Sequence, residues 1–444
     1  MVADRLDIRL SGQAQKRGLI PRMPAGERLL GDIETWLRAE YPDELGVVAR
    51  GSARTSGSPG ARGGARIGGS PGGPGGGIYV RFHPAAGPLN LTVDDDGVVT
   101  VNAETVSAGP GYHRFVGRVL ERLGLDLAID WSLADAGLAF ADRPAIERAY
   151  LTWLGPQLAE ARQRVRRGAR GIHVGLPTGT TFSVEEAVAT TLGPRDEAWL
   201  DAAIADPRTA IEVTPWWSDA TDGRYLLNRA LTLMWLEVRW RRPAIESETD
   251  VLDEVHRMLA RAYPLDPDLD YPWADWAEVI SYRGVDDGMA RQVIARAAQQ
   301  SRVQATPARI GYRRAPVTIR HEGWALTVPG DFAERRTAEE WWGGGAGRNI
   351  TLAATSTGTG VGRMTAQGFL SQVAGELGPD ALYHEAGDIR GRARITTDAS
   401  SGVEIGILEG FSAVTGSGAA IRIEFDGAED YVWALEMWRS LAPG

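Results

Sequence analysis

Apolar residues alternate with polar ones in three short stretches of the N-terminal third of the chain, which predicts β-strands. The predicted strands cover Ile78–His83, Leu89–Val93 and Val98–Asn102. Two further stretches, residues 26–41 and His113–Leu123, carry apolar residues at helical spacing. Between the last two strands, Asp96-Gly97 is typical of a hairpin turn. We therefore expect an N-terminal α+β domain over residues 1–145.

Residues 51–77 interrupt this pattern. They contain 12 glycines among 27 residues, together with serine, arginine and proline. Such a stretch buries too little apolar surface to offset the entropy lost on ordering. The sequence therefore predicts a flexible insertion within the N-terminal domain.

The apolar pattern of the middle of the chain has the helical period. Helices are predicted over residues 144–170, 222–240 and 285–300, and another is predicted to begin after Ser247 as its N-cap. Several tryptophans fall in this region. We expect a helical, Trp-rich domain over residues 146–305.

Strand-like alternation returns in the last third of the chain. Predicted strands include Val317–His321, residues 324–328, Val403–Leu408 and Ala420–Phe425, and a helix follows from Tyr431. The fold class expected for the whole chain is thus α+β multidomain, with a third domain over residues 313–444.

This third region resembles the Mog1/PsbP-like fold over about residues 315–444. The resemblance is carried by the segments Gly323-Trp-Ala-Leu-Thr-Val-Pro-Gly-Asp-Phe332, the predicted helix Met364–Leu377, the hairpin at Gly416-Ser-Gly418 and the terminal helix ending Trp438-Arg-Ser-Leu441. It implies an α/β sandwich that serves as a binding module without an active site. No functional residue is carried over from the family.

Composition narrows the classes of function. The net charge of −10 disfavours binding to nucleic acid or an anionic membrane, and the absence of cysteine excludes disulfides and thiolate metal sites. No apolar run is long enough to span a membrane and no signal peptide is seen, so we expect a cytoplasmic protein. Arginine supplies all but one of the basic residues, which indicates a GC-rich, actinobacterial source.

One loop has the composition of an anion-binding turn. Its segment is Ser107-Ala-Gly109-Pro-Gly111-Tyr112-His113, at the start of a predicted helix. Two glycines would let main-chain N–H groups approach a small anionic ligand, and the helix dipole would favour its charge. Tyr112 and His113 would add a hydrogen-bond donor and a proton-transfer group. A tight structural turn explains the same residues.

No catalytic residue, metal site or cofactor is predicted. The six histidines are scattered without metal-ligand spacing, and the nucleophile motif G-x-S-x-G is absent.

Aromatic and arginine side chains suggest a surface for a protein partner. The candidates are Trp216, Trp217 and Arg224 in the central region, and Arg162 and Arg166 in an arginine cluster at 162–170. A helical core explains the tryptophans equally well.

Two functional hypotheses remain open. The first is a non-enzymatic protein-binding or adaptor protein, with an immunity or chaperone-like role included. The second is an enzyme or sensor that binds a small anionic ligand at the Ser107–His113 loop.

Overall fold

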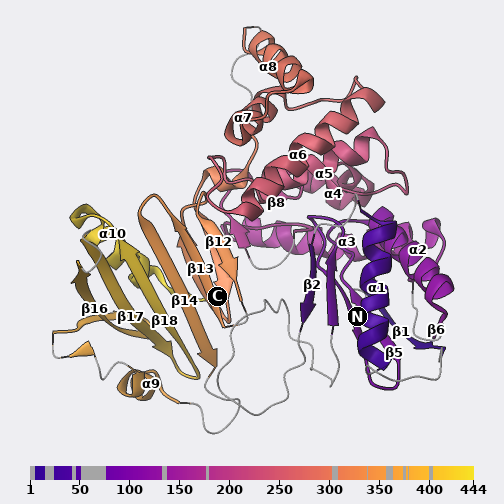
Figure 1. Ribbon diagram of the computed structural model, residues 1–444. Helices are drawn as coiled ribbons and strands as arrows, with labels where there is room; N and C mark the ends of the chain where they lie inside the picture. The colour runs from indigo at the N-terminus through magenta and orange to yellow at the C-terminus, as the bar shows by residue number, and fades with distance from the viewer. Residues whose placement is uncertain are drawn as a thin grey trace.

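Figure 1 shows the computed structural model, which places helices and antiparallel sheets along the chain. The structure describes residues 6–15, 25–42, 47–51, 77–132, 138–176, 180–302, 309–337, 339–356, 364–373, 377–378, 380–399 and 404–444. Most of the predicted glycine-rich insertion, residues 52–76, lies outside the described residues.

The N-terminal region forms an antiparallel sheet with two helices on one face. Its strands are β1 (Ile8–Ala14), β2 (Val47–Gly51), β3 (Gly77–Arg81), β4 (Leu89–Val93), β5 (Val98–Ala103) and β6 (Ile129–Trp131), in the order β2-β3-β4-β5-β1-β6. Alternation along β4 places Leu89 and Leu91 in the core and Thr92 on the exposed face. The three strands predicted here are confirmed.

Helices α1 (Ala25–Glu40) and α2 (Pro110–Leu127) cover the buried face of this sheet. Ile33 and Leu37 of α1 and Val116 and Val119 of α2 are fully buried against it. The predicted helix at 26–41 is confirmed. The second helix begins earlier than predicted, because Pro110 occupies the first helical turn, where its missing N–H costs no hydrogen bond.

The middle of the chain is mainly helical. It contains α3 (Arg143–Arg166), α4 (Glu197–Ala205), α5 (Gly223–Leu236), α6 (Glu246–Leu265), α7 (Trp273–Arg283) and α8 (Gly288–Gln300), with the short strands β7 (Thr180–Phe182), β8 (Val188–Thr190) and β9 (Gly193–Arg195) and the 3-10 turn η2 (Pro207–Val213). The predicted cap at Ser247 is wrong, because α6 already begins at Glu246 and its N-cap is Ile245. Figure 1 shows α7 and α8 projecting beyond the other helices.

The C-terminal region is built from two antiparallel sheets. Its elements are η3 (Tyr312–Arg314), β10 (Val317–His321), β11 (Trp324–Val328), β12 (Ala333–Arg336), β13 (Glu340–Gly345), β14 (Arg348–Ser356), α9 (Ala366–Val373), β15 (Leu382–Ala386), β16 (Ile389–Asp398), β17 (Ile405–Val414), β18 (Ser417–Phe425), η5 (Ala428–Asp430), α10 (Tyr431–Ser440) and β19 (Ala442–Pro443). One sheet has the order β12-β13-β14-β18-β17-β16-β15, and the other has the order β19-β11-β10-β7.

Strand β7 enters the C-terminal part from the middle of the chain. Phe182 of β7 pairs with Val317 of β10, and its ring stacks on Tyr312 with centroids 4.8 Å apart. The same apolar cluster contains Trp324, Trp341 and Trp438. The C-terminal sheets therefore incorporate a strand that precedes them by more than a hundred residues.

A second apolar cluster runs from the N-terminal sheet into the central helices. It joins Ile8 of β1 and Val116 of α2 to Met258 of α6 and Val293 of α8. Packing thus crosses the predicted boundary between residues 145 and 146, and the division into three domains stays a prediction.

Candidate binding surface

The loop Ser107–His113 is packed tightly against the segment that precedes α5. The Gly111 N–H donates to the Trp216 carbonyl at 3.0 Å, and the Trp216 N–H donates to the Ala108 carbonyl at 2.9 Å. Gly109 has φ 110, which favours glycine. A Cβ on Gly111 would lie 2.7 Å from Trp216 Cδ1 and would overlap the Ser218 carbonyl. The two glycines allow this close backbone approach, so the geometry favours a structural turn.

The side chains of this loop are also engaged with the protein. Ser107, Tyr112 and His113 are buried. His113 Nε2 donates to the Leu138 carbonyl at 3.0 Å, and its Nδ1 lies 2.8 Å from the Thr105 hydroxyl oxygen. Burial lowers the pKa of His113, and this outweighs the opposing effect of the backbone contacts. His113 is therefore a neutral core residue rather than an exposed proton donor.

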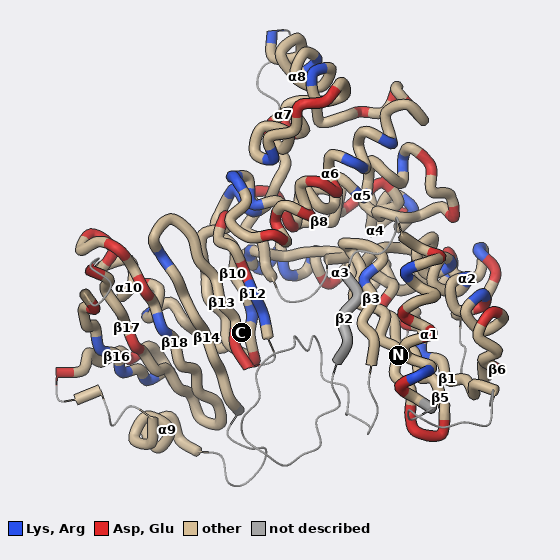
Figure 2. The backbone as a smooth tube through the Cα atoms, viewed as in Figure 1, with Lys and Arg blue, Asp and Glu red and all other residues tan. Residues whose placement is uncertain are grey.

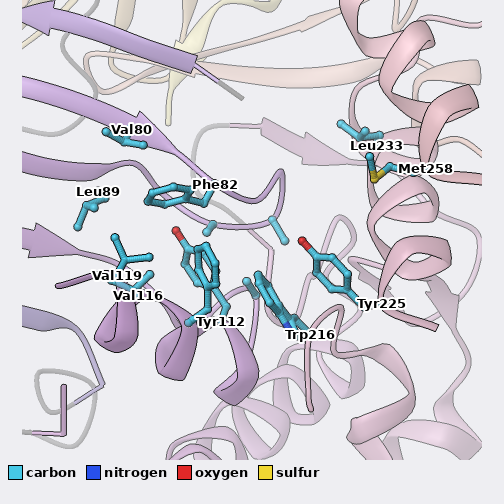
Figure 3. Packing of buried hydrophobic residues seen from close by; sticks show 14 of the residues in the cluster. Val80, Phe82, Leu89, Tyr112, Val116, Val119, Trp216, Tyr225, Leu233 and Met258 are labelled. Carbon is cyan, nitrogen blue, oxygen red and sulfur yellow. The ribbon is translucent and has the colours of Figure 1, made fainter. Parts of the chain in front are cut away.

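Figure 3 shows where Tyr112 and Trp216 lie, among the buried aromatic rings beside the N-terminal turn of α2. Trp216 is 1% exposed, and its ring centroid lies 4.2 Å from that of Tyr225 and 5.0 Å from that of Phe115. Trp216 is therefore a core residue rather than a contact for a partner. The sequence pattern could not distinguish these roles, because both use large aromatic side chains.

His83 joins the same cluster. Its ring centroid lies 6.2 Å from that of Tyr112, and its Nδ1 accepts from the Ala85 N–H at 3.1 Å. Burial, helped by Arg229 and Arg81, holds the pKa of His83 well below its ordinary value. Its Nε2 has no hydrogen-bond partner among the described residues. The ring is thus a neutral, buried group.

Of the other residues predicted to contact a partner, Trp217 and Arg162 contact the protein itself and Arg224 is exposed. Trp217 is half-buried and packs edge-on against Tyr150, with centroids 5.6 Å apart. Arg162 forms ion pairs with Glu197 and with Asp201, the latter at 2.7 Å, and so fastens α3 to α4. Arg224 is exposed at the start of α5.

Exposed arginines gather where α3 ends beside the four-stranded sheet. We call this group the arginine surface; its members are Arg164, Arg166, Arg167, Arg170 and Arg320. His173 lies near the charges of both elements. Burial is the first cause of its lowered pKa, and the charges of Arg164 of α3 and Arg320 of β10 lower it further. Figure 2 shows blue segments at the end of α3 that faces the C-terminal sheets.

The charge of the arginine surface is not neutralised by ion pairs with the described residues. Within the described part of the chain, none of its members forms an ion pair, whereas arginines such as Arg114, Arg283 and Arg348 pair with aspartates at 2.5 to 3.1 Å. The protein carries a net charge of −10 overall. The surface is thus a local region of positive potential on an acidic molecule, and it includes the predicted residue Arg166.

A hollow of about 270 Å³ lies on the outer face of the seven-stranded sheet beside α9. Val373, Leu377 and Phe411 form its apolar side. Its polar side is already neutralised, because Glu409 accepts from Arg394 at 2.9 Å and from Arg422 at 3.3 Å. A hollow of this kind suits an uncharged molecule better than an ion.

No family model matches the chain, and no curated protein matches it. Among the described residues, no helix is long and apolar enough to cross a membrane. Across the same part of the chain, no group of three or more histidine, aspartate or glutamate side chains is arranged to hold a metal ion.

Proposed function

We propose that the protein is a non-enzymatic binding protein whose arginine surface docks an acidic segment of a protein partner. The observation that carries the proposal is the cluster of exposed arginines, without ion pairs to the described residues, on a molecule of net charge −10. A patch opposite in sign to the rest of its protein selects partners by charge and speeds their association. An adaptor, immunity or chaperone-like role uses such a surface.

The small extent of the arginine surface favours a protein partner of limited size. Its arginines come from the end of α3 with the residues that follow it, and from β10. Gly171, just after α3, packs against Thr181 of β7, and β7 in turn pairs with β10. Guanidinium groups bind carboxylates with two parallel hydrogen bonds, so aspartate- and glutamate-rich segments match them. The negative net charge repels long polyanions such as DNA, which extend beyond the patch.

Charge reversal tests the proposal. The variant carries Arg166→Glu and Arg170→Glu. The control carries Arg302→Glu, just after α8, and Arg439→Glu, on α10; both residues are exposed and the change in charge is the same. Each protein is used to capture partners from a lysate of a GC-rich bacterial host, followed by quantitative mass spectrometry. We expect acidic proteins to be captured by the wild type and the control and lost with the variant.

Two results would count against this function. The first is an identical set of captured proteins with the variant and the control at the same salt concentration. The second is retention of nuclease-sensitive nucleic acid in place of protein, which would assign the surface to a different class of partner. Circular dichroism and thermal unfolding of all three proteins separate loss of binding from loss of fold.

We further propose that residues 313–444 are a Mog1/PsbP-like domain and that the protein is cytoplasmic. The seven-stranded antiparallel sheet with α9 and α10 packed against it supports the first part. Fractionation of the source cells tests the second part, and recovery in a membrane or extracellular fraction would contradict it.

A further inference from the structure

Helix α9 covers one end of the outer face of the seven-stranded sheet, where β17 turns into β18 (Figure 1). The Gly416 N–H of this turn donates to the Met364 carbonyl, just before α9, at 2.9 Å. The ring of Phe369 on α9 lies directly over Gly418, where a Cβ would be 2.2 Å from its Cζ. The hollow described above lies on the part of this face beside α9, so its walls come from both the helix and the strands.

The register of the strands places two rows of side chains on the outer face beside α9. One row is apolar and crosses three strands, with the members Ala353 of β14, Ala420 of β18 and Phe411 of β17. The other row lies two residues away on each strand and is polar, with the members Thr351, Arg422, Glu409 and Arg394. Side chains two residues apart share one face of a sheet, so the hollow has an apolar half and a polar half.

Two short side chains account for the depth of the hollow. Ala353 and Ala420 are half-buried and form its floor between taller neighbours. Val373, at the end of α9, and Leu377 stand on one side, and the long side chains of the polar row stand on the other. An enclosed cavity of about 150 Å³ holds one benzene ring. The hollow measures about 270 Å³ and therefore has room for two fused rings.

The charges of the polar half cancel one another. Arg394 donates to Glu409 at 2.9 Å, and Arg422 donates to Glu409 at 3.3 Å and to Glu424 at 2.9 Å. Two guanidinium groups are thus matched by two carboxylates. A charged ligand would lose its own hydration without gaining an uncommitted opposite charge, so the hollow favours an uncharged molecule.

One polar group of the hollow remains available to a ligand. Thr351 lies next to Ala353 on the same face of β14 and is half-buried. Its hydroxyl group makes no hydrogen bond with the described residues. A hydroxyl group both donates and accepts, so it can bind either a hydroxyl or a carbonyl group of a ligand and fix the orientation of its rings.

We propose that the hollow beside α9 binds a small, uncharged, planar molecule of two fused rings that carries one hydroxyl or carbonyl group. Its rings would lie on Ala353 and Ala420, with one edge against Phe411. Aromatic rings pack together more favourably than their buried area alone predicts, which favours a planar ligand over an aliphatic one. Its polar group would meet the Thr351 hydroxyl. This site is separate from the arginine surface and does not depend on the function proposed for it.

Calorimetric titration of the full-length protein with 2-naphthol at neutral pH tests the site. We expect saturable binding of one molecule per chain. Naphthalene-2-carboxylate has the same rings and a negative charge, and it should bind roughly tenfold more weakly or not at all. Decahydro-2-naphthol has a similar size and the same hydroxyl group but is not planar, and it should also bind more weakly. Tighter binding of the carboxylate than of 2-naphthol would contradict the proposed neutrality of the ligand.

The variant Ala420→Leu fills the floor of the hollow, and Ala386→Leu makes the same change at an exposed position of β15 that does not line it. We expect the affinity for 2-naphthol to fall at least roughly tenfold in Ala420→Leu and to be unchanged in the control. Thr351→Val keeps the shape of the side chain without its hydroxyl group and should weaken binding about fivefold, even if Ala420→Leu does not fold. A wild type without saturable binding, or equal affinities in the wild type, Ala420→Leu and Thr351→Val, would overturn the proposal.

Discussion

Replacing Gly111 with alanine should destabilise the protein, because the loop at the start of α2 has no room for a methyl group. The new Cβ would lie 2.7 Å from Trp216 Cδ1 and 2.9 Å from the Ser218 carbonyl carbon. Backbone atoms cannot rotate away, so α2 and the segment at 216–218 must separate. Overpacking of this kind costs about 1–3 kcal/mol, and weakening the two backbone hydrogen bonds across the contact adds about 1 kcal/mol. We expect a total loss of roughly 2–4 kcal/mol.

Gly288→Ala provides the matched control. No described atom outside its own helix lies within 4 Å of the position that the new methyl group would occupy at the start of α8. Alanine should therefore be neutral there or should stabilise by about 0.4–1 kcal/mol through the unfolded state. Urea unfolding followed by tryptophan fluorescence measures both variants. Equal midpoints for Gly111→Ala and the wild type would refute the tight contact, and would reopen the loop as a place for a ligand.

Three further outcomes are expected. The pKa of His83 is held well below 6.5 in the folded protein, so as pH falls below about 6.5 the imidazole is protonated in the unfolded state before it is protonated in the folded state. The free energy of unfolding should therefore drop by up to about 1.4 kcal/mol per pH unit until the folded pKa is reached. A plot of urea midpoint against pH should have a shallower slope for His83→Asn than for the wild type. Trp216→Ala should lower the free energy of unfolding by about 3–5 kcal/mol and Trp217→Ala by distinctly less, since only the ring of Trp216 is fully buried. Equal losses of stability for the two variants in urea unfolding would contradict this packing. Arg229→Met should lower the free energy of unfolding by about 3–5 kcal/mol, because it leaves the carboxylate of Glu254, its partner at 2.6 Å, without an opposite charge. Adding Glu254→Gln should restore part of the lost stability in the same assay.

The sequence predicts those strands and helices whose apolar pattern and bounding turn residues lie within one short stretch of the chain. Strands β10 and β11 occupy the predicted positions, Val317–His321 and residues 324–328, because strict alternation is bounded by turn residues on both sides. Strand β1 is absent from the prediction, because Ile8–Ala14 mixes glycine, serine and glutamine with few apolar residues. It becomes a strand between β5 and β6 through pairing with residues far along the chain.

The candidate sites depend on contacts that the sequence does not reveal. The glycines of the Ser107–His113 loop suggest an approaching ligand, but the approaching group is the backbone at 216–218. Arg162 and Arg166 are one helical turn apart, yet only Arg162 meets the acidic side chains of α4.

The pairing of β7 with β10 determines how this protein can be cut into pieces. A fragment starting at residue 313 would lack Phe182 and Tyr312 and would leave one edge of β10 without its neighbouring strand. Uncovered strand edges recruit other chains, so such a fragment should aggregate. Co-expressing a piece that contains residues 172–190 should keep it dispersed, since that piece supplies the missing strand.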